Sequence, residues 1–155
     1  MSAKSIANLF VACLTLGLAS CASSKKDAEI SKVSYYKLDS RKEITSADPA
    51  IPFEQKYRLH GAVSGDEMKA REGHYYTVHY RLRDLGQPVK VRLEYRQSKT
   101  AAKIFSKEMD AGKSGTAEFA VIGDEYANNG HVIAWKVSLV SGKQELAASK
   151  SYLWE

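Results

Sequence analysis

Hydrophobic and polar residues alternate with period two over most of the chain after residue 56, which is the pattern of β-strands that bury one face. The alternation is clearest in residues 89–96, where every second side chain is valine, leucine or tyrosine and the others are charged. Turn-forming residues separate the alternating segments at intervals of roughly 8 to 12 residues. The strands predicted in this way are residues 57–63, 76–82, 89–96, 102–109, 117–121, 131–139 and 146–154.

Each predicted strand has one face of apolar side chains that we expect to point inward. Lys150 interrupts the apolar face of the last strand, which indicates an edge position. Seven short strands with regular turns predict an all-β fold, an antiparallel β-sandwich, with a small closed β-barrel as the alternative. The expected inward residues are Tyr57, Leu59, Val63, Tyr76, Val78, Tyr80, Leu82, Val89, Val91, Leu93, Tyr95, Ala117, Phe119, Val121, His131, Ile133, Trp135, Val137, Leu139, Leu146, Ala148, Tyr152 and Trp154.

The run of strands resembles an immunoglobulin-like or fibronectin type III-like domain across about a hundred residues. In this resemblance Trp135 is the core aromatic residue, and the last two strands correspond to strands F and G of those domains. The resemblance implies two packed antiparallel sheets. The paired cysteines of antibody domains are missing, because the chain has only Cys13 and Cys21.

The first twenty residues have the layout of a secretory signal. Lys4 precedes an apolar run over residues 6–18, and small residues follow it. The run is shorter than the roughly 20 residues that a membrane-spanning helix needs. We therefore expect an export signal over residues 1–20.

The end of this signal, Leu18-Ala19-Ser20-Cys21, resembles the lipobox of bacterial lipoproteins. The resemblance implies cleavage before Cys21, a diacylglyceryl group on its thiol and acylation of the new amino terminus. Two or more acyl chains anchor a protein firmly, so the expected location is exported, on the cell membrane or the outer membrane. Ala22 follows the cysteine, and the resemblance then favours the outer membrane. The alternative is an ordinary signal peptide with a chance cysteine.

Residues 21–52 are rich in serine, lysine and acidic residues and are expected to form a lipidated amino terminus and a tether. Pro49 and Pro52 disfavour helix at the residue before each of them. Two alternatives stand for residues 33–38, an added edge strand or a short helical turn, and residues 67–72 have the length of one helical turn. The β-sandwich is expected to comprise residues 53–155.

The net charge of +5 does not indicate nucleic-acid binding, because basic and acidic residues are interspersed along the chain. Outward-facing charges on two neighbouring predicted strands form a basic stripe that would meet phosphate or carboxylate groups, or simply face solvent. The stripe consists of Arg81, Arg83, Arg92, Glu94 and Arg96. A basic face favours anionic lipids or polyanionic envelope polymers.

No residue pattern supports catalysis, a cofactor or a metal. Gly112-Lys113-Ser114 imitates a phosphate-binding loop but lacks the earlier glycine of that motif, and a charged hairpin turn explains it better. His60, His74, His79 and His131 have no zinc-ligand spacing. We therefore expect a non-enzymatic envelope lipoprotein that binds or supports another envelope component. The alternative is an anchored hydrolase or small-ligand carrier with a site built from loops around Asp66, His74 and Asp124.

Overall fold

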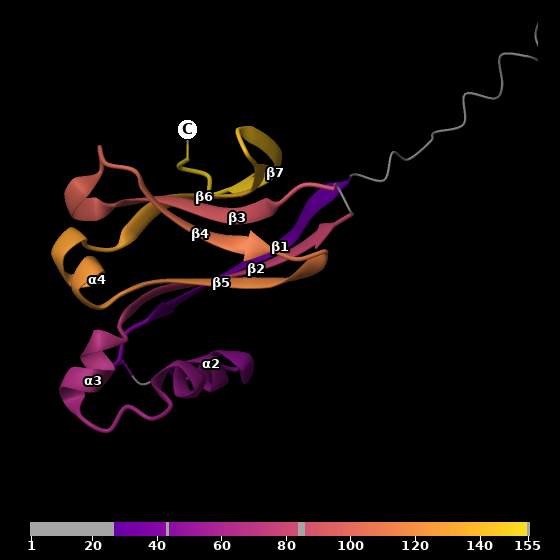
Figure 1. Cartoon of the computed structure of the whole chain (residues 1–155). Coiled ribbons are helices and arrows are strands. Elements are labelled where there is room, and N and C mark those ends of the chain that lie inside the picture. Colours follow the sequence, from indigo (N-terminus) through magenta and orange to yellow (C-terminus); the bar gives the residue numbers. More distant parts are fainter. Residues whose placement is uncertain (1–26, 43, 84–85, 155) are drawn as a thin grey trace, which may run out of the picture.

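Two antiparallel β-sheets pack face to face in the computed structural model, which describes residues 27–42, 44–83 and 86–154 (Figure 1). One sheet has the strand order β1-β2-β5, and the other has the order β4-β3-β6-β7. The predicted β-sandwich is confirmed, and the closed barrel is excluded because the sheets remain separate. The strands are β1 (Ala28–Leu38), β2 (Gly73–Leu82), β3 (Val89–Gln97), β4 (Phe105–Ala111), β5 (Ser114–Ile122), β6 (Val132–Ser141) and β7 (Gln144–Lys150).

The core lies between the two sheets and is built from the alternating residues of β2, β3 and β5. Burial of such side chains contributes roughly 1.5 to 3 kcal/mol each, so this layer dominates the stability of the fold. Tyr76 and Tyr95 are the largest fully buried side chains. The inward positions predicted for these three strands are confirmed, namely Tyr76, Val78, Tyr80, Leu82, Val89, Val91, Leu93, Tyr95, Ala117, Phe119 and Val121.

Strand β1 confirms the added edge strand that was one alternative for residues 33–38 and extends it back to Ala28, so this part of residues 21–52 is not a tether. Its eleven residues pair with β2 along their length. A bulge between Ile30 and Lys32 shifts the register, so Ile30 and Val33 both face the core although they are three positions apart. A bulge of this kind breaks the period of two, and the strand is hidden from a search for alternation.

The predicted strand over residues 57–63 is wrong, because residues Ala50–Leu59 form helix α2. Pro52 lies in the first turn, where a backbone N–H has no intrahelical partner and proline is tolerated. Side chains one turn apart support the helix. Arg58 forms an ion pair of 2.8 Å with Glu54.

The other helices lie at the end of the sandwich where β1 finishes (Figure 1). Helix α3 (Gly65–Ala70) begins with a capping box between Ser64 and Glu67, which satisfies otherwise unpaired backbone donors. This confirms a helical turn in the 67–72 region. Two further elements are the 3-10 helix η1 (Ser98–Thr100) and helix α4 (Gly123–Asn129).

Helix α4 is fixed to the core by Glu125. Its carboxylate accepts hydrogen bonds from the hydroxyl of Tyr95 and, at 2.8 Å, from Nζ of Lys107. The same ammonium group donates to the carbonyl of Ala120 at 2.5 Å. The side-chain amide of Gln97 donates to the backbone carbonyls of Glu125 at 3.2 Å and of Gly130 at 2.8 Å. These bonds connect the two sheets at one end of the core.

At the start of β6 the predicted inward residues are partly wrong. His131 is exposed and Ile133 is half-buried, whereas Val132 and Ala134 are buried. The cause is an extra residue in β6: the adjacent β3 residues Arg96 and Gln97 pair with Ala134 and Val132, so Ile133 is left between them without a partner in β3. The pattern is restored at Val137 and Leu139, which are fully buried, and Trp135 packs edge to face on Tyr76 at 5.9 Å.

The carboxyl-terminal strand is an edge strand, as Lys150 predicts. The inward positions expected beyond it are not reached: Tyr152 is 99% exposed and Trp154 is half-buried. The strand ends at Lys150, because the chain turns away from the sheet after the backbone of Ser151 bonds to Trp135.

The sheet order also corrects two expectations about charged residues. Strands β2 and β3 lie in different sheets, so Arg81 and Arg83 are separated from Arg92, Glu94 and Arg96 and form no common stripe. Arg81 instead faces Glu29 at 3.8 Å, and Arg92 faces Glu108 at 2.7 Å. Gly112 and Lys113 do form a tight turn, but the turn joins strands of different sheets and is not a hairpin.

Candidate functional site

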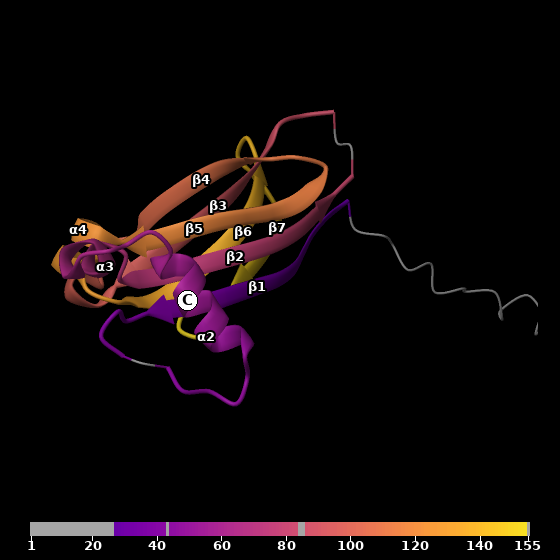
Figure 2. The same cartoon turned by 90° about the horizontal axis from the view of Figure 1, so that it is seen from below.

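Helix α2 lies over the outer face of the β1-β2-β5 sheet, towards the end where β1 finishes (Figure 2). It buries none of its residues. Arg58 makes the main connection to the sheet: its guanidinium group stacks 4.6 Å from the ring centroid of Tyr75 and lies 3.2 Å from the carboxylate of Glu118. Only 12% of the Arg58 side chain is exposed. One cation therefore joins the helix to both β2 and β5.

The chain segment after α2 reinforces this contact. Arg71 donates hydrogen bonds to the backbone carbonyls of Arg58 at 3.1 Å and His60 at 2.6 Å. The hydroxyl of Tyr75 donates to the carbonyl of Arg71 at 2.7 Å. The result is a closed ring of contacts that holds the carboxyl-terminal end of α2 on the sheet.

A groove of about 330 Å³ separates the rest of α2 from the sheet. Its volume lies at the lower end of the range for ligand pockets, and its walls combine apolar surface with hydroxyl groups. The hydroxyl of Tyr36 is buried without a hydrogen-bond partner among the described residues. Residues of the two walls include Ser34, Tyr36, Ile51, Glu54, Tyr75 and Thr77.

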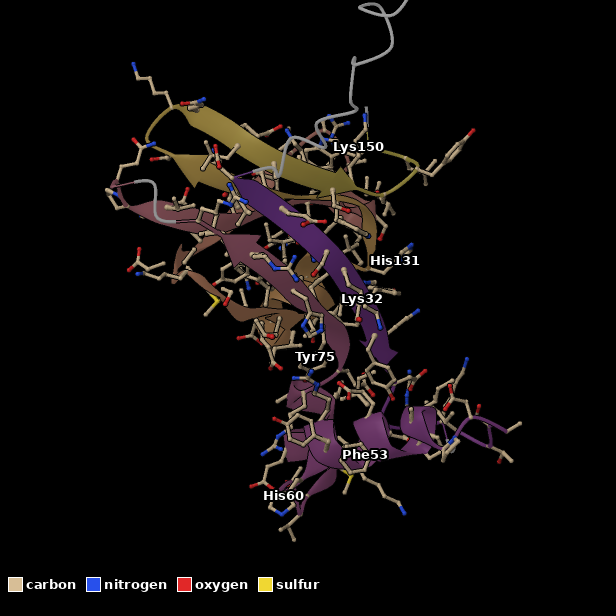
Figure 3. All side chains as sticks on the ribbon, turned by 90° about the vertical axis from the view of Figure 1, so that its right-hand side faces the viewer. Lys32, Phe53, His60, Tyr75, His131 and Lys150 are labelled. Atoms are coloured by element: carbon tan, nitrogen blue, oxygen red, sulfur yellow. The ribbon has the colours of Figure 1, made fainter. Side chains whose placement is uncertain are left out.

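The outer side of α2 and the loop after it are apolar and exposed. Phe53 and Tyr57 stack on each other at 6.4 Å and are 67% and 56% exposed. Val63 is 88% exposed. Figure 3 shows Phe53 at the opposite end of the molecule from Lys150. We call Phe53, Tyr57 and Val63 the α2 apolar surface. Exposed apolar groups gathered on one element are typical of interaction sites.

The electrostatics of the site favour binding over acid-base chemistry. Burial alone would lower the pKa of Arg58, but its hydrogen bonds to Glu54 and Glu118 outweigh this effect and raise the pKa. Burial also raises the pKa values of Tyr36 and Tyr75. The cation and both phenols thus keep their protons at neutral pH. They offer hydrogen-bond donors and aromatic faces rather than a base.

The three residues of the expected loop site come to one end of the fold but not to one reaction centre. Asp66 is in α3, Asp124 is in α4, and both are exposed. His74 is only 1% exposed. Its ring lies between Tyr35, at 5.2 Å, and Tyr126, at 5.5 Å. The imidazole is therefore enclosed by aromatic rings, whereas the two carboxylates face solvent.

The remaining residues considered from the sequence are dispersed. His60 follows α2 at the surface, and His79 shares a hydrogen bond of 3.1 Å with Thr116. In residues 27–42, 44–83 and 86–154, no group of three or more histidine, cysteine or acidic residues is arranged to hold a metal ion. The same residues include no helix with the length and apolar character to cross a membrane. Cys21 and the signal lie outside the described residues.

A larger hollow, of about 700 Å³, lies between the edge strands β1 and β7. Carboxylates on its walls are balanced by nearby cations: Asp27 faces Arg83 at 3.7 Å, and Glu145 faces Lys136 at 2.5 Å. Ile30 and Leu146 contribute apolar surface. The hollow is an open trough at the end of the sandwich where β1 begins.

Sequence reasoning missed the α2 site, because the supposed strand over residues 57–63 placed Tyr57 in the core. Spacing of one helical turn was the available signal: Phe53 and Tyr57 are four residues apart, as are Glu54 and Arg58. Comparison of the chain with protein-family models, curated proteins and solved structures gives no match.

Proposed function

We propose that this protein is a lipid-anchored envelope module without enzymatic activity, which binds another envelope protein through the α2 apolar surface. The anchor is Cys21, carried on the cell membrane or the outer membrane by its acyl chains. The fold that presents the surface is a fibronectin type III-like sandwich, a resemblance supported by the strand orders β1-β2-β5 and β4-β3-β6-β7.

The exposure of the aromatic pair Phe53 and Tyr57 is the observation that carries this proposal. A helix normally turns its apolar side chains towards the core, yet α2 turns these two outward. Arg58 holds the helix in place by charge and stacking, which leaves the aromatic residues available. Aromatic side chains are enriched at protein interfaces, so a protein partner fits this surface better than a polyanionic polymer.

The acid-base candidates of the expected loop site, His74, Asp66 and Asp124, do not favour a catalytic role. His74 is enclosed, and its pKa is lowered to about 4, first by burial and then by Lys37 and His131. A general base must reach the proton that it removes. Asp66 and Asp124 face solvent on separate helices. We therefore propose no catalytic role for these three residues.

Site-specific photocrosslinking in native membranes tests the proposal. A photoreactive phenylalanine analogue replaces Phe53 in the full chain, and the matched control carries it at Met109, which is also exposed but lies on β4 in the other sheet. We expect a defined crosslinked partner for position 53 and none for position 109. Mass spectrometry of the amino terminus should give an acylated Cys21.

Each part of the proposal has its own contrary result. An unmodified Cys21, or a chain in the soluble fraction, would overturn the anchor. An acylated chain with no crosslink at position 53, or with the same products at both positions, would overturn the binding surface. Substrate turnover by the purified protein would overturn the non-enzymatic assignment.

A further inference from the structure

The groove between α2 and the β1-β2-β5 sheet has no role in the proposed function, which places the partner on the α2 apolar surface. Helix α2 lies on the side of this sheet that faces away from the other sheet (Figure 1). It buries none of its residues, and the groove of about 330 Å³ separates it from the strands. A helix that covers a sheet normally packs its apolar side chains against it. The space under α2 is therefore open to a ligand.

Two cross-strand pairs form the floor of the groove. Ser34 of β1 lies opposite Thr77 of β2, and Tyr36 lies opposite Tyr75. Residues directly opposite each other share one face of a sheet, and this is the face under α2. Ser34 and Thr77 are half-buried, and neither hydroxyl group forms a hydrogen bond with a residue in the described part of the chain. Each can both donate and accept one.

The helix side of the groove presents a carboxylate oxygen and apolar surface. Ala50, Ile51 and Glu54 line this side. The contacts of 2.8 Å between Arg58 and Glu54 both go to the Oε1 atom. The Oε2 atom accepts no hydrogen bond from any of the residues that the structure describes. Hydrogen-bonding groups therefore lie on both sides of the groove, next to apolar side chains.

The charged groups of the groove are already paired, which favours a neutral ligand. Arg58 contacts Glu54 at 2.8 Å and Glu118 at 3.2 Å. It is the one cation among the described residues that line the groove. An anionic ligand would meet two carboxylates around this cation, and a cationic ligand would compete with it for Glu54. Separating one partner from an ion pair that is mostly buried is costly.

A wholly apolar ligand does not match the groove either. It would remove the hydroxyl groups of Ser34 and Thr77 and the Oε2 atom of Glu54 from water without replacing their hydrogen bonds, which is unfavourable for each group. A sugar ring combines C–H faces with hydroxyl groups at its edges. Its C–H groups can pack on the negative face of an aromatic ring such as Tyr36, while its hydroxyl groups both donate and accept.

We propose that the groove under α2 binds a neutral saccharide of one or two rings. Its hydrogen-bonding partners are Ser34, Thr77 and Glu54, and its apolar contacts are Tyr36 and Ile51. The volume of the groove is at the lower end of the range for ligand pockets and matches a small ligand. The site requires neither the lipid anchor nor the protein partner, so it goes beyond the proposed function.

Saturation-transfer NMR of the purified full chain tests the proposal, with maltose, cellobiose and diacetylchitobiose as probes. The chain is measured in phosphatidylcholine vesicles if it is acylated and in buffer if it is not. We expect at least one of these disaccharides to bind with a Kd of about 1 mM or below. Added at about twice its Kd, that sugar should slow amide exchange in α2 and in residues 33–38 about threefold. Exchange in β6, in the other sheet, should not change.

Removal of the two floor hydroxyl groups should weaken sugar binding. The double variant Ser34→Ala and Thr77→Val nearly preserves side-chain size and should raise the Kd about tenfold or more. The matched control, Ser106→Ala and Thr116→Val, removes the same groups from exposed positions on β4 and β5, outside the groove, and should leave the Kd unchanged. If thermal unfolding shows the double variant to be unstable, Thr77→Val alone should raise the Kd about fivefold.

The contrary results are separate from those for the proposed function. No binding by any of the three sugars would overturn the inference, and so would equal binding by the double variant and its control. Protection of α2 by 1-octanol in the absence of sugar binding would assign the groove to apolar ligands and overturn the saccharide. An unmodified Cys21 or a missing crosslink at position 53 would overturn the proposed function and leave the sugar measurement valid. Phe53→Ser should bind the sugar with unchanged Kd.

Discussion

The hydroxyl of Tyr35 and the Nδ1 atom of His74 share a hydrogen bond of 3.2 Å across the pair of strands β1 and β2. It joins the edge strand to a side chain that is almost fully buried. The other ring nitrogen, Nε2, is also buried, and no residue in the described part of the chain bonds to it. The neutral imidazole is thus the form that this environment accepts.

The burial of His74 predicts a loss of stability in mild acid. The pKa is about 4 in the folded protein and 6.5 in the reference state, so the unfolded chain binds more protons between these values. The free energy of unfolding should fall as pH decreases from 6.5 to 4, by about 3 kcal/mol or less. Denaturant titrations at several pH values measure the slope. His74→Phe should remove it and the exposed His60→Gln should keep it; equal slopes in all three proteins would refute the assignment.

Replacement of Arg58 should loosen helix α2 locally without unfolding the rest of the domain. Arg58→Met removes the ion pairs to Glu54 and Glu118 and leaves the stacked face of Tyr75 without its cation. We expect the docking of α2 to weaken by about 1 to 2 kcal/mol, which is roughly a five- to thirtyfold faster amide exchange in α2. Hydrogen exchange followed by mass spectrometry gives the rate. Lys56→Met, on the exposed side of the same helix, is the control, and equal exchange in the two variants would contradict the role of Arg58.

Removal of the Tyr95 hydroxyl, which donates a hydrogen bond to Glu125, should measurably lower the stability of the domain. Tyr95→Phe keeps the buried ring and removes the donor to the carboxylate, which then retains Lys107. The free energy of unfolding should decrease by about 1 to 2 kcal/mol with an unchanged denaturant slope. Tyr152→Phe, at a position 99% exposed, should change it by about 0.5 kcal/mol or less. Similar effects of the two substitutions would argue against the role of the Tyr95–Glu125 hydrogen bond in holding α4 on the core.

Among the glycines, we expect substitution of Gly73 to lower the stability most. Its φ is +144°, and a Cβ atom there would lie 2.2 Å from the carbonyl oxygen of Val121. Gly73→Ala should therefore cost about 3 kcal/mol or more, because the backbones of β2 and β5 must separate. Gly65→Ala, with no atom within 4 Å of the new methyl group, should be neutral or slightly stabilising. Thermal unfolding of both variants measures the difference, and a tolerated Gly73→Ala would contradict the described approach of the two strands.

The core strands were predictable because their alternation of apolar and polar residues matches the buried and exposed faces that they have in the fold. In β2, β3 and β5 the alternation of side chains continues without a bulge. β1 obeys the same rule only on each side of its bulge at Ile30 and Lys32. For α2, Pro52 argued against a helix although it lies in the first turn, where it is harmless.

Sheet order and the candidate site are non-local, and alternation does not encode them. The link over residues 83–88 is short enough for a hairpin, but it crosses between the sheets. Tyr36, Arg58 and Tyr75 come from three elements and meet only after β1 pairs with β2. The pattern predicted which face of β2 is inward, but its predicted strand began at Tyr76 and it contained no information about the helix that covers Tyr75.

The pairing of β1 with β2 also has a kinetic consequence. Ala28 pairs with Leu82 and Leu38 with Gly73, so more than thirty residues, including two helices, separate the nearest partners. The chain must close this long loop before the first ladder bond forms, and contacts of large sequence separation slow folding. In the other sheet the β3–β4 and β6–β7 pairs are joined by connections of seven and two residues, whereas β3 and β6 also meet across a long loop, from Gln97 to Val132. We expect the two local pairs to form first, so that β1 joins its sheet only after the loop between Leu38 and Gly73 has closed.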